Sequence, residues 1–176
     1  LGTLELLLTK PLGLWQIILG KYIATLLLLL TALLPTVVYF FALAVLKLDD
    51  IALDWGSALT AYLGLFWVGA SFVALGLLSS LVTRSQVSAF LLALLLCFVQ
   101  FYVWKAIADL MQEEGFYRFF NSVGIFEHYL SLRQGVVALQ DGIYFLGFNY
   151  IVLYISKLML NRIKNHFKTN SWPSLI

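Results

Sequence analysis

Four long apolar stretches limit this chain to a small set of folds. Each is about as long as the roughly 20 residues needed to cross a bilayer core, and none carries a charge near its centre. Within a bilayer the backbone polar groups must be satisfied internally, which favours helices. We therefore predict an all-α polytopic membrane protein with a single domain over residues 1–176. The predicted spans are residues 22–46, 58–82, 87–104 and 143–160.

The composition excludes several other classes of protein. Hydrophobic residues make up 62% of the chain and charged residues 11%, whereas soluble domains carry about 25% charged residues. The net charge of +2 is too small to indicate a nucleic-acid partner. The chain also opens without Met and without the pattern of a signal peptide, so we expect it to be part of a longer polypeptide.

The distribution of cations predicts which segments face the cytoplasm. Seven cations fall on the side of residue 1, and four fall on the opposite side. By the positive-inside rule the side richer in cations is cytoplasmic. This places residue 1 and the basic tail 161–176 in the cytoplasm, and it places residues 105–142 outside. The seven are Lys10, Lys21, Arg84, Lys157, Arg162, Lys164 and Lys168; the four are Lys47, Lys105, Arg118 and Arg133.

The first twelve residues predict a short amphipathic helix on the water side of the membrane. Thr3 is a suitable N-cap, and Pro11 prevents the helix from continuing. Leu4, Leu7 and Leu8 share one face, whereas Glu5 points elsewhere. Such a helix is available to a soluble partner, and we expect Gly2, Thr3, Leu4, Glu5, Leu7, Leu8 and Thr9 to form the contact surface.

Two further groups of residues have structural interpretations. Trp15 and Lys21 flank the entry into the first span, where an aromatic ring and a long ammonium side chain commonly anchor a helix at the membrane surface. Small residues recur along the second span and let helices approach closely. Packing within the chain and a subunit interface both remain open for this face, which comprises Gly69, Ala70, Ala74, Gly76 and Ser80.

The segment 105–142 mixes acids with aromatic residues, a pattern typical of short helices lying in the membrane interface. An ordinary interfacial loop and an outer gate beside the last span are both compatible with it. Glu127, His128 and Asp141 lie on this side of the membrane. The sequence has no Gly-x-Ser-x-Gly motif to present a nucleophilic serine, so no hydrolase site is expected. Gly13 and Gly20-Lys21 have the wrong spacing for a phosphate-binding loop. We predict no catalytic residue, cofactor or metal site, and therefore no enzyme.

Three blocks of the sequence carry a family resemblance. They are residues 2–12 (GTLELLLTKPL) with 18–22 (ILGKY), residues 74–87 (ALGLLSSLVTRSQV), and residues 126–145 (FEHYLSLRQGVVALQDGIYF). In this order the blocks resemble type-2 ABC transporter permeases, most closely the gliding-motility-associated permease subunit of Bacteroidetes. Gln16 stands where such permeases often carry Glu.

The resemblance implies more than the residues alone do. It implies a six-span permease of a bacterial inner membrane, in which the four spans here are the third to the sixth. It also implies that residues 1–12 form a coupling helix seated on a cytoplasmic ABC ATPase, and that a second permease subunit pairs with this one. ATP hydrolysis then occurs on the separate ATPase chain. The alternative is a membrane anchor that scaffolds a motility or secretion assembly without transport.

Overall fold

The computed structural model describes residues 13–46, 55–110 and 113–170 of the chain, and all the regular structure in these residues is helical. The predicted all-α membrane fold is confirmed: the described residues contain four helices long and apolar enough to cross a membrane. The expected surface helix 1–12 lies outside the described residues, as does the end of the tail at 171–176.

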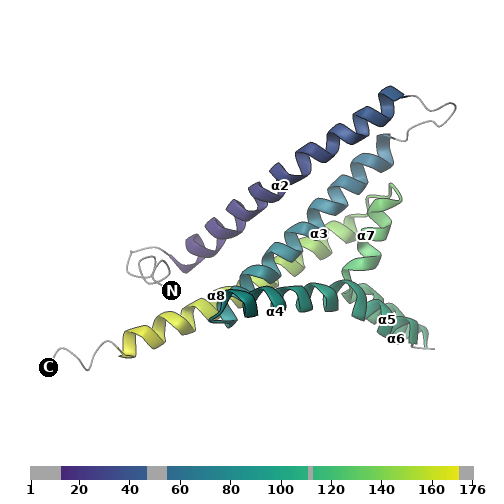
Figure 1. Cartoon of the computed structure of the whole chain (residues 1–176). Helices are drawn as coiled ribbons and strands as arrows, with labels where there is room; N and C mark the ends of the chain where they lie inside the picture. Colours follow the sequence, from purple (N-terminus) through teal and green to yellow (C-terminus); the bar gives the residue numbers. More distant parts are fainter. Residues whose placement is uncertain (1–12, 47–54, 111–112, 171–176) are drawn as a thin grey trace.

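The four membrane-crossing segments run back and forth through the molecule (Figure 1). The first is helix α2 (Leu14–Leu46) and the second is α3 (Trp55–Val82). The third joins α4 (Gln86–Phe98), the π-helical turn η1 (Val99–Val103) and α5 (Trp104–Leu110). The fourth is α8 (Leu139–Asn170).

Several helices extend beyond the predicted spans. α2 begins at Leu14 rather than at residue 22, and α8 covers 139–170 rather than 143–160. The third segment passes residue 104 and continues to Leu110, because Lys105 finds acidic partners in Glu127 and Asp109 at 3.0 and 3.9 Å. The predicted spans were ended near charged residues. A helix can continue past such a residue when its charge is paired or reaches the membrane interface.

Helix α3 lies at the centre of the fold, in contact with α2, α4, α8 and the short helix α7 (Ile125–Arg133). One apolar core joins Ile18 of α2 and Ala74 of α3 to Val152 of α8. A second core joins Val68 of α3 to Ile125 of α7 and Phe145 of α8. The two cores lie along α3 and α8, so these two helices form the framework that positions the rest.

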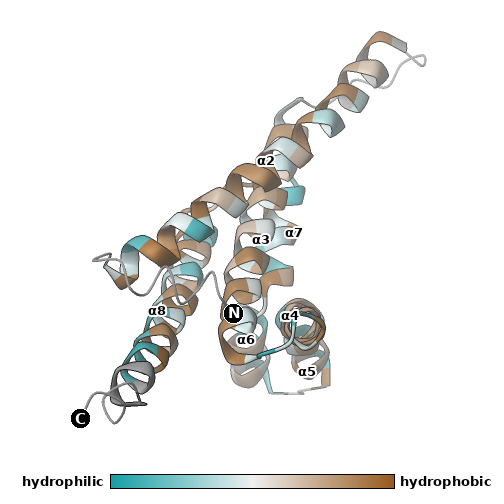
Figure 2. Cartoon of the chain, turned by 60° about the vertical axis from the view of Figure 1, so that its left-hand side comes forward, coloured by the Kyte–Doolittle hydropathy of each residue, from teal (hydrophilic) through white to brown (hydrophobic). Residues whose placement is uncertain are grey.

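Helices α2 and α4 present most of their apolar surface outward. In the most apolar part of the third segment none of the residues is buried, whereas a third are buried in the corresponding parts of α3 and α8. Leu28, Leu34 and Val38 of α2 are all about two-thirds exposed. Hydrophobic residues also prevail along α2 and α3 in Figure 2. Such surfaces suit contact with lipid or with further transmembrane helices.

The short helices α6 (Glu114–Val123) and α7 cover one end of this framework. α6 packs against α5, and α7 packs against α3, η1 and α8. They occupy the segment that the sequence predicted to contain short interfacial helices. Gly135, whose φ of 84° suits glycine, turns the chain between α7 and the start of α8.

Candidate functional site

The start of α2 is fixed by a local cap. The Gly13 backbone N–H donates a hydrogen bond to Gln16 Oε1 at 3.0 Å. This is half of a capping box, in which the residue at the third helical position satisfies a backbone donor that the helix cannot. A Gln or a Glu can fill this role equally. The cap therefore fixes the start of α2 at the residue that follows the segment 1–12 in the sequence.

The first turn of α2 meets the middle of α8 through aromatic rings. The Trp15 indole stacks on Tyr150 with 6.3 Å between ring centroids, and it lies 6.4 Å from the Tyr154 ring. Lys157 Nζ lies 4.9 Å from the centroid of the Trp15 ring. Tyr150, Tyr154 and Lys157 share one face of α8 because they are spaced by four and three residues. We call these four residues the Trp15 junction.

The structure gives Trp15 a contact that sequence reasoning missed. Membrane anchoring remains a prediction for Trp15 and Lys21, and Lys21 is exposed on α2. The Trp15 ring, however, is partly buried against α8 and forms a cation–π contact with Lys157. The spacing of Tyr150, Tyr154 and Lys157 indicates that they share one helix face. It does not indicate that this face contacts α2.

The predicted packing face of α3 divides into two parts. Ala70 and Ala74 are buried at 2% and 0% exposure, and Gly69 comes so close to α2 that an added Cβ would lie 2.6 Å from Leu29 Cδ2. Gly76 has open space where a Cβ would be, with no described atom within 4 Å, and Ser80 is exposed. The first three residues therefore pack within the chain, whereas the last two face outward.

At the opposite end of the fold, His128 and Asp141 form a buried pair. Nδ1 of His128 lies 2.7 Å from Asp141 Oδ1, and the two residues are 7% and 5% exposed. Nε2 of His128 donates to the Ser122 carbonyl at 3.1 Å, because a carbonyl oxygen only accepts. Both ring nitrogens of His128 are thus engaged, which holds the His128–Asp141 pair from two sides. It links α6, α7 and α8.

The π-helical turn η1 supports the same cluster from the third segment. Gln100 Nε2 donates to the Val123 carbonyl at 2.8 Å and to the Tyr144 hydroxyl at 3.0 Å. The Tyr144 hydroxyl in turn donates to the Val123 carbonyl at 2.6 Å, and its ring stacks on His128 with 3.9 Å between centroids. A π-turn shifts the direction of the side chains it carries, and such turns are common at functional sites.

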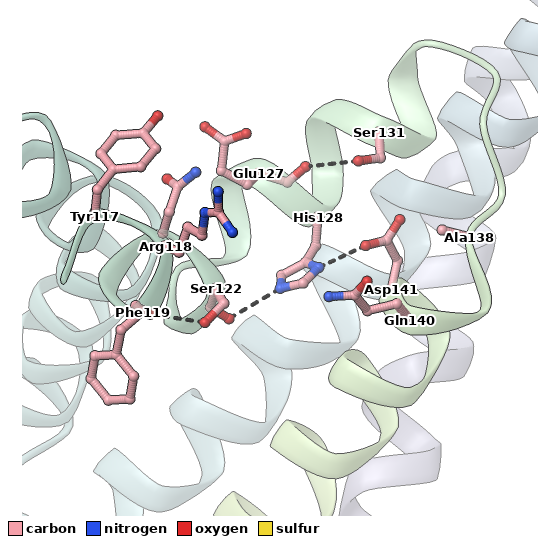
Figure 3. A pocket seen from close by; sticks show the side chains of 11 residues that line it. Tyr117, Arg118, Phe119, Ser122, Glu127, His128, Ser131, Ala138, Gln140 and Asp141 are labelled. Carbon is pink, nitrogen blue, oxygen red and sulfur yellow. Dashed lines mark hydrogen bonds and ion pairs between the residues drawn. The ribbon is translucent and has the colours of Figure 1, made fainter. Parts of the chain in front are cut away.

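A pocket of about 620 Å³ opens beside this pair (Figure 3). Its walls come from α6, α7 and the first turn of α8, with His128 and Asp141 on the side toward α8. The remaining lining residues are Tyr117, Arg118, Phe119, Asn121, Ser122, Glu127, Ser131, Ala138 and Gln140. Sequence reasoning named Glu127, His128 and Asp141 but did not bring any of them to a common site.

Comparison with known proteins decides the family. The family model for the ABC-2 family transporter protein matches residues 1–160. This chain belongs to the ABC-2 family. No curated protein and no solved structure matches it.

Membership fixes the broad function. The chain is a multi-pass membrane permease of an ABC transporter, and this family supplies the transport component of a complex whose partner is an ABC ATPase. The ABC-2 permease is not itself the catalytic component. Among the described residues, no three His, Cys, Asp or Glu side chains group to hold a metal ion. The resemblance found in the sequence is thus confirmed at the level of the family.

Proposed function

We propose that this ABC-2 permease receives the movement of a cytoplasmic ATPase through residues 2–9 and passes it to α8 through the Trp15 junction. In this proposal Gly2, Thr3, Leu4, Glu5, Leu7, Leu8 and Thr9 contact the ATPase. The observation that carries the proposal is the contact of Trp15, in the first turn of α2, with Tyr150, Tyr154 and Lys157.

The geometry of α2 supports this path. Because the Gln16 cap holds the first turn, a displacement of the segment before it acts on Trp15 at once. Ile18, one turn farther along α2, is 4% exposed and belongs to the core shared with α3 and α8. Packed apolar contacts of this kind transmit small shifts because interiors have little free volume. Movement at the start of α2 would thus reach both α3 and α8.

The charge distribution supports a cytoplasmic position for this end. Lys21, Arg84, Lys157, Arg162 and Lys164 lie toward the start of α2 and the end of α8, whereas Lys105, Arg118 and Arg133 lie near the other end. An excess of Lys and Arg favours the cytoplasmic side. We therefore place residue 1 and the tail 161–176 in the cytoplasm of a bacterium, and the chain in its inner membrane.

The finer identity rests on the resemblance of the three sequence blocks. We infer a gliding-motility-type complex in which a second permease subunit pairs with this chain. The outward apolar surfaces of α2 and α4 suit contact with such a subunit.

Deleting residues Thr3 to Thr9 tests the ATPase contact. We expect the variant to insert into the membrane but to lose co-purification with the ATPase, because the contact surface is gone. Glu5→Lys should weaken the same contact without shortening the chain. Lys164→Met, which changes an exposed cation of α8, is the matched control. Retained ATPase binding by the deletion variant would contradict the proposal.

A second measurement separates transport from scaffolding. In reconstituted vesicles a transporter loses ATP-dependent flux when the catalytic glutamate of the ATPase is replaced. A scaffold shows no flux in either case and keeps its function after that replacement. Flux that depends on the glutamate supports the proposal, and its absence assigns the chain to the anchor class.

A further inference from the structure

Helix α6 has one apolar face and one polar face. Residues that are three and four positions apart lie on the same side of a helix. The apolar side, which we call the Phe face, comprises Phe116, Phe119, Phe120 and Val123. The polar side comprises Glu114, Arg118, Asn121 and Ser122. Such a division is typical of a helix that lies between water and an apolar medium.

The protein covers only part of the Phe face. Phe120 stacks on Trp104 of α5 with 6.1 Å between ring centroids. Phe116 and Phe119, in contrast, are 56% and 62% exposed. The structure describes every residue of α6 and buries none of them, whereas α7 has three buried residues. Of the two short helices, α7 thus belongs to the core, and α6 has a face that is open to a further partner.

The polar face shows that α6 cannot be immersed in lipid. Arg118 and Glu114 pair at 3.4 Å, and their side chains are 79% and 90% exposed. Arg118, Asn121 and Ser122 also line the pocket beside His128. Charged side chains are costly inside the hydrocarbon core of a bilayer. The helix therefore fits the surface of a bilayer rather than its interior.

The size of the open area argues against a protein partner. An aromatic side chain buries about 150–250 Å² when it is covered, so two rings of this exposure offer roughly 200–300 Å². A specific protein interface buries about 800 Å² on each partner. The binding of a helix to a lipid surface scales instead with the apolar area that it buries. The open part of the Phe face is thus better suited to lipid than to a second protein.

Helix α6 also adjoins a segment that crosses the membrane. It packs against α5, which ends the third membrane segment (Figure 1). Leu110, the last residue of α5, is 78% exposed. Aromatic side chains gather where a membrane segment reaches the lipid surface. Phe116 and Phe119 follow this segment closely in the sequence, so lipid is available to both rings.

We propose that Phe116 and Phe119 anchor α6 in the surface of the lipid bilayer at this end of the fold. The two rings insert among the lipid chains, and the polar face is turned toward water. On its other side α6 is held by His128, whose Nε2 donates to the Ser122 carbonyl at 3.1 Å. The helix then forms a wall between the lipid and the pocket. This role does not depend on ATPase coupling, because the Trp15 junction lies at the opposite end of the fold.

Spin labels test which medium covers the Phe face. Cys97 is the only native cysteine, so labels are introduced into the Cys97→Ala chain. Phe116→Cys, Phe119→Cys, Glu114→Cys and Arg118→Cys are made singly, and each carries a nitroxide in nanodiscs. Molecular oxygen concentrates in lipid, whereas the neutral nickel chelate NiEDDA stays in water. We expect the labels on the Phe face to lose collisions with NiEDDA and to gain collisions with oxygen, relative to the labels on the polar face.

Two outcomes would overturn the proposal. Equal NiEDDA collision rates on both faces would show that water covers the Phe face. Protection of the Phe face from both reagents would show that protein covers it, for instance a second copy of the chain. Each labelled variant keeps at least one of the two rings, so an anchor is present in every measurement.

A charge on the Phe face gives an independent test. With the label in place of Phe116, Phe119→Asp should raise the NiEDDA collision rate, because a carboxylate among lipid chains is costly and α6 leaves the bilayer. Gly115→Asp is the matched control. It adds the same side chain at the edge of the polar face, where an added Cβ meets no described atom within 4 Å, and it should leave the rate unchanged. Equal rates in the two variants would contradict an anchor at Phe119.

Discussion

Lys157 of α8 lies over the indole of Trp15 in the first turn of α2, with 4.9 Å between Nζ and the ring centroid. The two residues belong to the first and the last described membrane helices, so this contact closes the bundle at the end where α2 begins. Tyr154 is shared between them, since it lies beside both the Trp15 ring and the Lys157 ammonium. A contact of this kind can join the movement of one helix to the other.

Replacing Lys157 by Met tests this junction. Met keeps an unbranched stem over the ring but removes the charge, so the cation–π contribution of about 0.5–1 kcal/mol is lost. In the complex with its ATPase we expect less transport for each ATP hydrolysed, with membrane insertion unchanged. Lys164→Met, also on α8 but exposed, serves as the control. Unchanged coupling in Lys157→Met would limit the contact to a purely local role.

Trp15 itself should be more sensitive than Lys157. Trp15→Leu removes the stacking on Tyr150 as well as the surface under the ammonium. Aromatic pairs add about 0.5–1.5 kcal/mol beyond their buried area, so the loss should exceed that of Lys157→Met. The rate of limited proteolysis at the start of α2 measures this loss of packing, because a first turn that is released from α8 is cleaved faster. Trp55→Leu replaces the Trp that begins α3 and contacts Phe41 near the other end of α2, so it should not change the cleavage rate at the start of α2.

The spans were predictable because their signal is local. A run of some twenty apolar residues gives a helix wherever the bilayer removes water from the backbone, whatever the partners of that helix are. The Trp15 contact was not predictable for a related reason. Lipid chains and neighbouring helices are similarly apolar, so the residues around Trp15 do not distinguish an anchor in lipid from a ring packed on Tyr150.

The His128–Asp141 pair escaped sequence reasoning for a geometric reason. It depends on how the chain turns at Gly135 and on the early start of α8 at Leu139, which places Asp141 in its first turn. Neither feature follows from hydropathy. In the structure Glu127 binds Lys105, whereas its neighbour His128 binds Asp141.

Removing either member of this pair should destabilise the fold strongly. Breaking a buried ionic pair by deleting one partner typically costs 3–5 kcal/mol, because the other group stays buried without compensation. We expect such losses for His128→Ala and for Asp141→Ala in reversible unfolding with mixed detergent micelles. The double variant should lose less free energy of unfolding than the two single variants lose together, because it leaves neither side chain buried without its partner. Strict additivity would show that the two side chains do not interact.

Two glycines of α3 allow a sharp test of helix packing. An added Cβ at Gly64 would lie 3.0 Å from Leu132 Cβ of α7, an atom that cannot move without its backbone. Gly64→Ala should therefore destabilise the protein by about 1–3 kcal/mol, as overpacking does. Gly76→Ala meets no described atom within 4 Å and should leave the unfolding free energy nearly unchanged. The same detergent titration measures both. If Gly76→Ala instead weakens association with a second subunit, while the isolated chain unfolds as before, the outward part of this face belongs to a subunit interface.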